Sequence, residues 1–428
     1  MREYAPPRLS VVTVALPEPV DLLSLLPAEP VVSWVRDGDG LVGWGQAARL
    51  DVYGQERFSR AQRWWAQVCD AADVRDAVSV PGTGPTAFAS FTFASGPAAS
   101  IMIVPQVVIG RRHDKSWLTV VSEHPGTRPA AEPTLAEVLA APARIQAPGR
   151  VREEPGSLSE LGWRAAVDEA VARVRAGGLD KVVLARDTVV VSEHDLDPRF
   201  LMTQLSAAYP ECWTFTVAGL VGATPELLVR RTGSTVVSRV LAGTVHRAAD
   251  SSADGRLAAA LLSSDKDLVE HLYAVESVAA ALARHCTDLR VPASPSILAL
   301  ANVQHLATDV SGMLADDASA VALAASLHPT AAVCGTPTER AAAVIDELEG
   351  MDRGRYAGPV GWVDSRGDGE FGIALRCGSL EAPRTLRLYA GCGIVAGSTA
   401  DGEWAESEAK LSAMRTAVGA SAQTTAAG

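Results

Sequence analysis

The chain has 428 residues, of which 48% are apolar and 21% are charged, a composition typical of an ordinary globular protein. A formal net charge of −12 and the lack of a basic stripe argue against a nucleic-acid partner. No apolar run approaches the roughly 20 residues that span a bilayer, and the N-terminus MREYAPPRLS has no apolar leader, so we expect a cytoplasmic protein without membrane contact.

The numbers and spacing of cysteine and lysine indicate which kinds of reactive site the chain can form. The six cysteines are scattered without a C-x-x-C pair, which predicts reduced thiols and argues against a disulfide framework or a zinc site. Because a buried lysine can lose its proton and an arginine cannot, each lysine is a candidate for chemistry. Only four of the 38 basic residues are lysine: Lys115, Lys181, Lys266 and Lys410.

Residues 1–150 predict mixed strands and short helices. Short or alternating apolar runs such as LSVVTVALP and SIMIVPQVVIGRR, separated by Gly and Pro, predict a sheet. No catalytic residue types gather before residue 125. Residues 126–158 are rich in Pro and Ala, and we interpret them as a crossing segment between two halves. We therefore expect residues 1–150 to form the N-terminal portion of one α/β fold.

The second half begins with apolar residues at helical spacing over 163–174, followed by the β-branched run DKVVLARDTVVV, which predicts a strand. A long helix is predicted over 263–284. Another helix is predicted to start with Thr336 as its cap, Pro337 at the first position and Glu339 three residues after the cap. Strands that arrive in runs, with helices between them, predict α+β layers.

Two charged residues stand at the ends of apolar strands. Lys181 opens KVVLAR, where it either extends to solvent or is desolvated and acts as a general base or nucleophile. Glu226, in GATPELLVRR, either pairs with Arg230 or Arg231, or keeps its proton in a desolvated site and acts as an acid. Residue type alone leaves both alternatives open.

Three further features are compatible with an anionic ligand. Glu270, on the predicted helix over 263–284, either pairs with Lys266 or is an oxygen ligand for Mg²⁺. Arg376 lies inside the apolar run GIALRCGSL, where a buried arginine predicts a carboxylate or phosphate partner. The glycine-dense strand ends LAGT, VCGTP and AGCGIVAGS either bring backbone N–H groups to an anion or form tight turns. Together these residue types suit metal-assisted chemistry on a small polycarboxylate.

Ten segments occur in the order found in chorismate-utilising enzymes, and over about residues 160–415 the chain resembles that family, whereas the first 150 residues match loosely. The segments are DKVVLARD, ATPELLVRR, LAGT, KDLVEH, NVQHLATDV, LHPTAAVCGTP, YAGPVGWVD, GIALRCGSL, LYAGCGIVAGS and EWAESEAKL. The resemblance implies a layered α/β/β/α sandwich of the anthranilate synthase component I type. It also implies that residues 155–420 form the chorismate-binding catalytic domain.

Carried over by position, the resemblance implies that Lys181 activates water for attack at C2 of chorismate and that Glu226 protonates the departing C4 hydroxyl. Glu270 and Glu406 match the two carboxylates that bind Mg²⁺, the implied cofactor. The residues that match substrate-binding positions are Gly243, Thr244, His305, Ala332, Val333, Tyr356, Arg376, Gly391, Gly393 and Lys410.

The segment GEWAESEAK at 402–410 holds three glutamates. Glu406 and Lys410 stand four residues apart, a spacing typical of a surface ion pair on a helix. The resemblance gives this spacing a second meaning, because one helix face can direct both side chains into the same pocket. We expect Glu403 and Glu408 to remain ordinary surface carboxylates.

Within the family, Lys181 argues against the anthranilate-forming members, which generally lack this lysine and use ammonia from a glutaminase partner. We therefore expect no glutaminase subunit. The sequence shows no signature of a subunit interface, so a monomer remains compatible with it. Ala332 resembles isochorismate synthases, because salicylate and aminodeoxychorismate synthases tend to carry Thr at that position. The implied function is the reversible isomerisation of chorismate to isochorismate, for menaquinone, siderophore or salicylate-derived metabolism.

The alternatives are a salicylate synthase, which goes on to eliminate pyruvate, and then an aminodeoxychorismate synthase component. A catalytically silent homologue is a further alternative, and it would be expected to have lost one of the four catalytic or metal-binding residues. Lys181, Glu226, Glu270 and Glu406 are all present.

Overall fold

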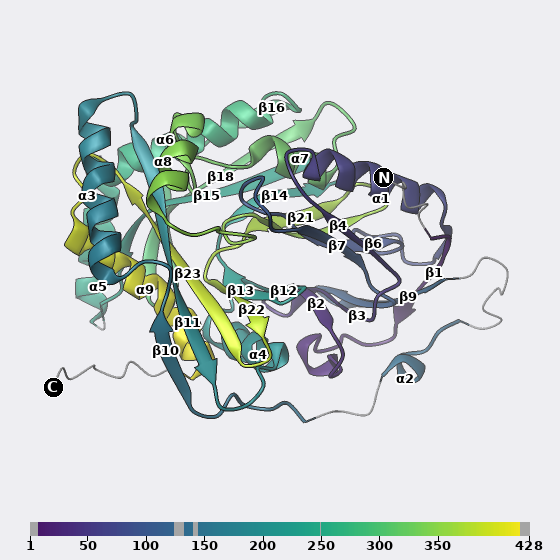
Figure 1. The fold of residues 1–428 in the computed structure, drawn as a ribbon. Helices are drawn as coiled ribbons and strands as arrows, with labels where there is room; N and C mark the ends of the chain where they lie inside the picture. The colour runs from purple at the N-terminus through teal and green to yellow at the C-terminus, as the bar shows by residue number, and fades with distance from the viewer. Residues whose placement is uncertain (1–6, 124–131, 140–143, 249, 420–428) are drawn as a thin grey trace.

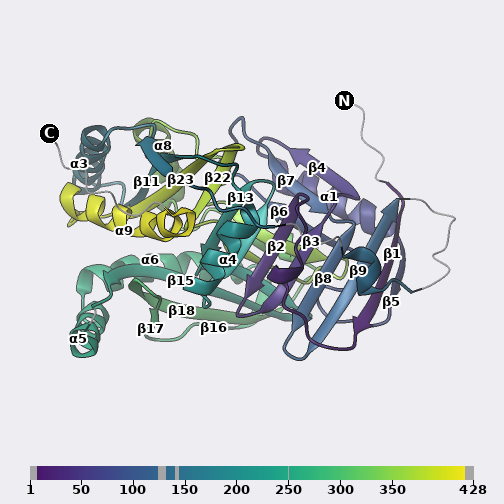
Figure 2. The ribbon, with the colours of Figure 1, turned by 90° about the horizontal axis from the view of Figure 1, so that it is seen from below.

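The structure is a computed structural model that describes residues 7–123, 132–139, 144–248 and 250–419 (Figure 1). Two large β-sheets pack against one another, and helices cover their outer faces (Figures 1 and 2). This arrangement confirms the predicted layered fold. None of the described helices has the length and hydropathy needed to cross a bilayer.

The larger sheet has thirteen strands within the described residues. Their order along the sheet is β10 (Val151–Pro155), β11 (Lys181–Ser192), β23 (Thr385–Ile394), β22 (Cys377–Ala382), β13 (Leu220–Thr224), β12 (Trp213–Val217), β2 (Val31–Arg36), β3 (Asp39–Trp44), β8 (Val107–Arg112), β9 (Lys115–Glu123), β1 (Leu9–Leu16) and β5 (Asp73–Asp76). The short strand β19 (Gly335–Thr336) also pairs with β11.

The smaller sheet has ten strands within the same described ranges. Their order is β16 (Cys286–Arg290), β18 (Val303–Leu314), β15 (Thr235–His246), β14 (Leu227–Thr232), β21 (Gly369–Ile373), β20 (Pro359–Asp364), β6 (Thr86–Ser90), β7 (Ser100–Val104) and β4 (Ala48–Val52), with β17 (Ser296–Ala299) paired to β18.

The helices divide between the two sheets. Those packed on the larger sheet are α3 (Glu160–Ala176), α4 (Pro198–Ala208), α8 (Thr338–Leu348) and α9 (Ala400–Val418). Those on the side of the smaller sheet are α1 (Arg57–Asp70), α5 (Ser251–Leu262), α6 (Asp265–Leu282) and α7 (Ala320–Leu327). Two short turns, the 3-10 helix η1 (Leu23–Leu25) and α2 (Leu135–Val138), lie in the first 150 residues.

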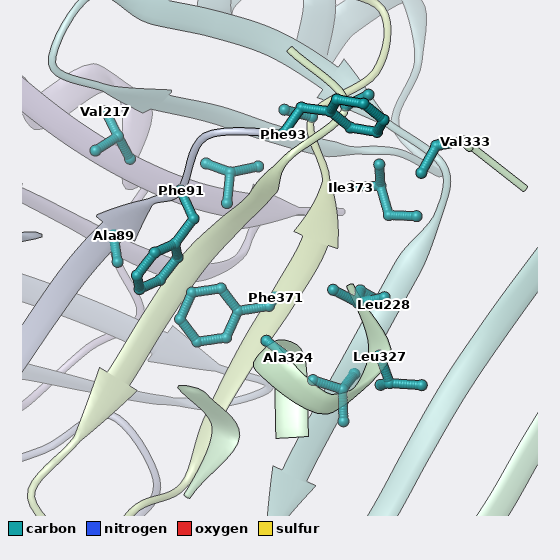
Figure 3. Packing of buried hydrophobic residues seen from close by; sticks show 14 of the residues in the cluster. Ala89, Phe91, Phe93, Val217, Leu228, Ala324, Leu327, Val333, Phe371 and Ile373 are labelled. Carbon is teal, nitrogen blue, oxygen red and sulfur yellow. The ribbon is translucent and has the colours of Figure 1, made fainter. Parts of the chain in front are cut away.

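Strands from the first 150 residues extend both sheets. β2 pairs antiparallel with β12 in the larger sheet, and β6 pairs antiparallel with β20 in the smaller one. The space between the sheets is filled by apolar side chains from both parts of the chain. Figure 3 shows Phe91, which follows β6, near Phe371 of β21, and their ring centroids are 6.2 Å apart. Each such buried ring contributes about 1.5–3 kcal/mol.

The two helices that matter most for the site have well-formed ends. The Ser264 hydroxyl accepts a hydrogen bond from the backbone N–H of Asp267 and caps α6. The Thr399 hydroxyl caps α9 in the same way through Gly402, and Gly419 ends α9 in the left-handed conformation. The caps therefore fix where α6 and α9 begin.

One helix start differs from the sequence expectation. We expected Thr336 to cap the helix with Pro337 at its first position, but α8 begins at Thr338 with Pro337 as the N-cap and no side-chain cap bond. The reason is that Thr336 belongs to β19, where it pairs with Lys181 of β11. Pairing within the sheet therefore overrides the local capping signal.

Candidate active site

A cavity of about 100 Å³ lies between the layers. β11 and β23 of the larger sheet and β15 and β18 of the smaller sheet contribute to its walls, together with α6 and α9. In Figure 2, α9 lies alongside β11 and β23, and α6 lies alongside β15 and β18. The expected residues that line it are Glu226, Gly243, Thr244, Glu270, His305, Ala332, Val333, Tyr356, Arg376, Gly391, Gly393, Glu406 and Lys410.

Lys181, at the first position of β11, is not among the described residues that line the cavity, but it contacts Glu270, which does. Its side chain is buried, and its Nζ lies 2.9 Å from Oε1 of Glu270 on α6. Gly393 of β23 makes the contact possible, because a Cβ there would overlap Glu270 Oε1 and lie 3.0 Å from Lys181 Cε. Lys181 therefore does not extend to solvent, and it is a partner of Glu270. The side chain of Lys266, the alternative partner of Glu270, lies outside the described residues.

Glu226 is the second buried titratable group. It follows β13 and precedes β14, and its backbone is fixed because its carbonyl accepts from Ile373 N at 3.2 Å. Burial raises the pKa of Glu226 to about 8, although the positive charges of Lys181 and Lys410 oppose this shift. The carboxyl group therefore carries its proton at neutral pH and can donate it.

Four carboxylates line the cavity from two helices. Asp267 and Glu270 project from α6, and Glu403 and Glu406 project from α9. Each pair is spaced by three residues, so both members share one helix face. The expectation that Glu403 is a surface residue was wrong, since its side chain is buried and lines the cavity.

Asp267 and Glu403 were missed from the sequence although a signal existed. Both stand one helical turn before an expected metal ligand. The physical reason is that residues three apart point the same way, so a ligand at one position brings its neighbour to the same cavity. Glu408, in contrast, lies away from the cavity lining and forms ion pairs with Arg186 and Arg415, as expected for a surface carboxylate.

The acidic cluster suits a hard cation. Ligand atoms of Cys392, Glu403 and Glu406 lie within 4.8 Å of one another. Burial raises the pKa of the Cys392 thiol well above its ordinary value, so the thiol stays protonated. The carboxylates are thus the available ligands, and oxygen donors are those that Mg²⁺ takes in proteins.

Arg376 is placed to bind a carboxylate. One of its nitrogens, Nη2, donates to His305 Nε2 at 2.7 Å, and His305 Nδ1 lies 3.0 Å from Thr244 Oγ1. Burial, followed by the charge of Arg376, holds the pKa of His305 well below its usual value, so the ring is neutral. Among the described residues, the buried Nη1 of Arg376 has no hydrogen-bond partner. Its backbone also has φ 47°, a strained conformation typical of functional positions.

Lys410 and Tyr356 complete this end of the cavity. Lys410 Nζ donates to Gly391 O at 2.8 Å and to Glu406 Oε1 at 2.6 Å. Burial disfavours the charge of Lys410, but Glu406 outweighs it and raises the pKa of Lys410, which stays protonated. The Tyr356 ring stacks on Tyr389 with centroids 4.9 Å apart. The cavity is therefore lined by two positively charged side chains, those of Lys410 and Arg376.

A β-bulge shapes the opposite wall. The pairing of β15 with β18 shifts between Ala242 and Thr244, and Gly243 at the shift has φ 78°. The extra residue lets the walls come close, because a Cβ at Gly243 would lie 3.2 Å from Asp267 Cβ. The bulge thus brings β15 against α6, and beside it Thr244 of β15 contacts His305 of β18.

Comparisons with known proteins agree with this site. A family model described as chorismate binding enzyme matches residues 13–419. Isochorismate synthase DhbC of Bacillus subtilis is 42% identical over 269 residues, which are 60% of this chain and 67% of the relative. The salicylate biosynthesis isochorismate synthase of Pseudomonas aeruginosa is 35% identical over 436 residues, covering 94% of this chain and 89% of the relative.

A solved structure extends the likeness to the whole fold. MenF, the menaquinone-specific isochorismate synthase from Escherichia coli, matches with a TM-score of 0.79 at 26% identity, covering 97% of this chain and 95% of the other. Both the predicted fold class and the resemblance inferred from the ten segments are thus confirmed. The chain belongs to the family of chorismate-binding enzymes.

Proposed function

We propose that the chain is an isochorismate synthase, an isomerase that converts chorismate reversibly to isochorismate with Mg²⁺ as cofactor. The observation that carries this proposal is that the acid candidate Glu226 lines the cavity, while the base candidate Lys181 is buried against Glu270, another lining residue. Both support general acid–base catalysis without a redox cofactor. The relatives named isochorismate synthase support the same reaction.

Chorismate carries two carboxylates, and the cavity offers a separate partner for each. Arg376, with its spare Nη1 donor, together with Lys410 and Tyr356, binds the enolpyruvyl carboxylate. Glu270 and Glu406 would hold Mg²⁺, which when bound would supply positive charge to neutralise the ring carboxylate. The ring is thereby oriented between Lys181 and Glu226.

The chemical step needs one proton accepted and one donated. Lys181 accepts a proton from the water that attacks C2. Glu226 donates its proton to the C4 hydroxyl, which leaves as water. One water is consumed and one released, so the reaction is an isomerisation overall. The high pKa of Glu226, about 8, keeps the proton available at neutral pH.

A product analysis tests this function. The purified chain is incubated with chorismate and Mg²⁺, and the products are separated by HPLC. We expect isochorismate at equilibrium with chorismate. Salicylate with pyruvate would instead establish a salicylate synthase, and a lack of turnover would indicate a silent homologue. Ala332, which lines the cavity, supports the first outcome.

A further inference from the structure

The strand that carries Lys181 has a gap along one of its edges. β11 pairs with β23 along one edge from Val182 to Val191. On the other edge, β19 pairs with residues 181–182 and β10 pairs with residues 188–192. Among the described strands, none pairs with residues 183–187 on that edge. The backbone N–H of Val183 donates to Cys334 O at 2.8 Å, just before β19. The residues are buried, so the other backbone groups on this edge need other hydrogen-bond partners.

A buried ion pair fills the gap. Glu349, at the end of α8, accepts from the backbone N–H of Ala185 at 2.7 Å, and Arg353 Nη2 donates to Val183 O at 2.7 Å. Arg353 Nε also donates to Glu349 Oε2 at 2.8 Å. The side chains are only 1% (Glu349) and 3% (Arg353) exposed. The ion pair thus serves two backbone groups of β11, the Ala185 N–H and the Val183 carbonyl, that no described strand pairs.

Arg353 is itself one of the residues that line the cavity, and it contacts other parts of the wall. Its Nη1 donates to Val333 O at 2.8 Å, and its guanidinium lies 4.2 Å from the centre of the Phe93 ring. Phe93 and Val333 are drawn in Figure 3, and Val333 lines the cavity. One planar guanidinium therefore connects the β11 backbone to the loop before β19. A lysine could not reproduce this connection, because it lacks the fixed fork of donors.

Both connected segments carry parts of the site. Val183 stands two residues after Lys181 and points to the same face of β11, where it lines the cavity. The loop that contains Val333 continues into β19, whose Thr336 pairs with Lys181. Arg353 thus connects the segment of the base candidate to the wall that borders the substrate.

We propose that Arg353, oriented by Glu349, is a positioning residue that sets where Lys181 stands relative to the substrate ring. This inference rests on the proposed function. Arg353 lines the cavity, but four hydrogen bonds engage its guanidinium with Glu349, Val183 O and Val333 O, so we expect it to act through the segments that it connects. Its loss should slow the chemical step more than it weakens substrate binding.

The chain offers a matched control two residues away. Arg355 is also largely buried, and its guanidinium donates to two backbone carbonyls, Val217 O at 2.8 Å and Ala218 O at 2.7 Å. It does not line the cavity within the described residues. Arg355→Lys therefore alters a guanidinium that donates to two backbone carbonyls in the same loop, without touching β11.

The test measures kcat, KM for chorismate and the melting temperature for the wild type, Arg353→Lys and Arg355→Lys. We expect Arg353→Lys to lower kcat by about 10- to 100-fold, the scale of a small displacement of a catalytic group. We expect its KM to change by less than about threefold, because the carboxylate-binding side chains remain. Arg355→Lys should lower the melting temperature but keep kcat within about twofold.

Glu349→Gln provides a second variant, since it keeps an acceptor for Ala185 N–H and removes the charge that orients Arg353. We expect its kcat to fall in the same direction, with KM again little changed. Wild-type kcat in Arg353→Lys, an equal loss in Arg355→Lys, or failure of both Arg353→Lys and Glu349→Gln to fold would overturn the positioning role. Absence of turnover in the wild type itself would instead overturn the proposed function.

Discussion

Lys181 and Glu270 form a buried ion pair, with Nζ 2.9 Å from Oε1, that connects β11 of one layer to α6 of the other. The two side chains meet over Gly393 of β23. A base candidate and an expected metal ligand are therefore in direct contact. Any change at this point should affect both the chemistry and the metal site.

Gly393→Ala tests that contact. The added Cβ would overlap Glu270 Oε1 and lie 3.0 Å from Lys181 Cε, so one of the two side chains must move. We expect kcat to fall by about 100-fold, as for a displacement of about 1 Å at a catalytic group. Gly397→Ala is the control, because a Cβ there would meet no atom within 4 Å. Equal activity of the two variants would contradict the assigned role of the pair.

Glu226→Gln tests the acid. The amide cannot donate a catalytic proton, so kcat should fall by about 10²- to 10⁴-fold. In the wild type, burial raises the pKa of Glu226 to about 8. The rate should therefore decline as pH rises above about 8, where the carboxyl group loses its proton. A pH–rate profile with no such decline would rule out Glu226 as the acid.

The same shift predicts how stability depends on pH. The pKa of Glu226 rises from an ordinary value of 4.5 to about 8 on folding. Between pH 4.5 and about pH 8, this carboxyl group is therefore protonated more often in the folded state than in the unfolded chain. Its contribution to stability is full below about pH 4.5 and is lost as pH rises to about 8. Urea titrations across this range should show a weaker pH dependence for Glu226→Gln than for the wild type.

The glutamates of α9 should separate by function. Glu406→Gln and Glu403→Gln should each weaken Mg²⁺ binding by about tenfold or more, since both line the cavity. Glu408→Gln is the matched control, because Glu408 pairs with Arg186 and Arg415 instead. Calorimetric titration with Mg²⁺ measures the difference. A loss of affinity in Glu408→Gln equal to that in Glu406→Gln would refute the assignment.

Arg376→Lys should affect substrate binding more than turnover. The lysine keeps the charge but cannot serve His305 and a substrate carboxylate at once, as the two nitrogens of Arg376 can. A charge-assisted hydrogen bond contributes about 1.5–3 kcal/mol, so KM for chorismate should rise by about 10- to 100-fold. An unchanged KM would show that the enolpyruvyl carboxylate binds elsewhere.

Much of the local structure could be read from the sequence. The apolar spacing over 163–174 predicted α3, and the β-branched run after Asp180 predicted β11. These predictions succeeded because helical and strand periodicities depend only on neighbouring residues. The cap at Thr336 failed, because the same backbone was needed for pairing with Lys181.

The site could be predicted in part. Thirteen of the residues that line the cavity were predicted from the ordered segments. The prediction succeeded because each residue was assigned by its position within a short segment that matches the family. Glu403 was misplaced and Asp267 was missed, since which face of a helix points inward depends on what packs against it. The roles of Glu349 and Arg353 were also invisible, because the gap in β11 that they fill exists only once the strands are paired.

The sequence by itself therefore determined the family, the elements of the second half and the residue types needed for acid–base chemistry and metal binding. Only the tertiary structure decided which carboxyl group keeps its proton, which lysine meets which glutamate, and which arginine retains a spare donor. The physical reason is that protonation and ion pairing depend on burial and on distances between residues far apart in the chain. Those distances are set by the packing of the two sheets.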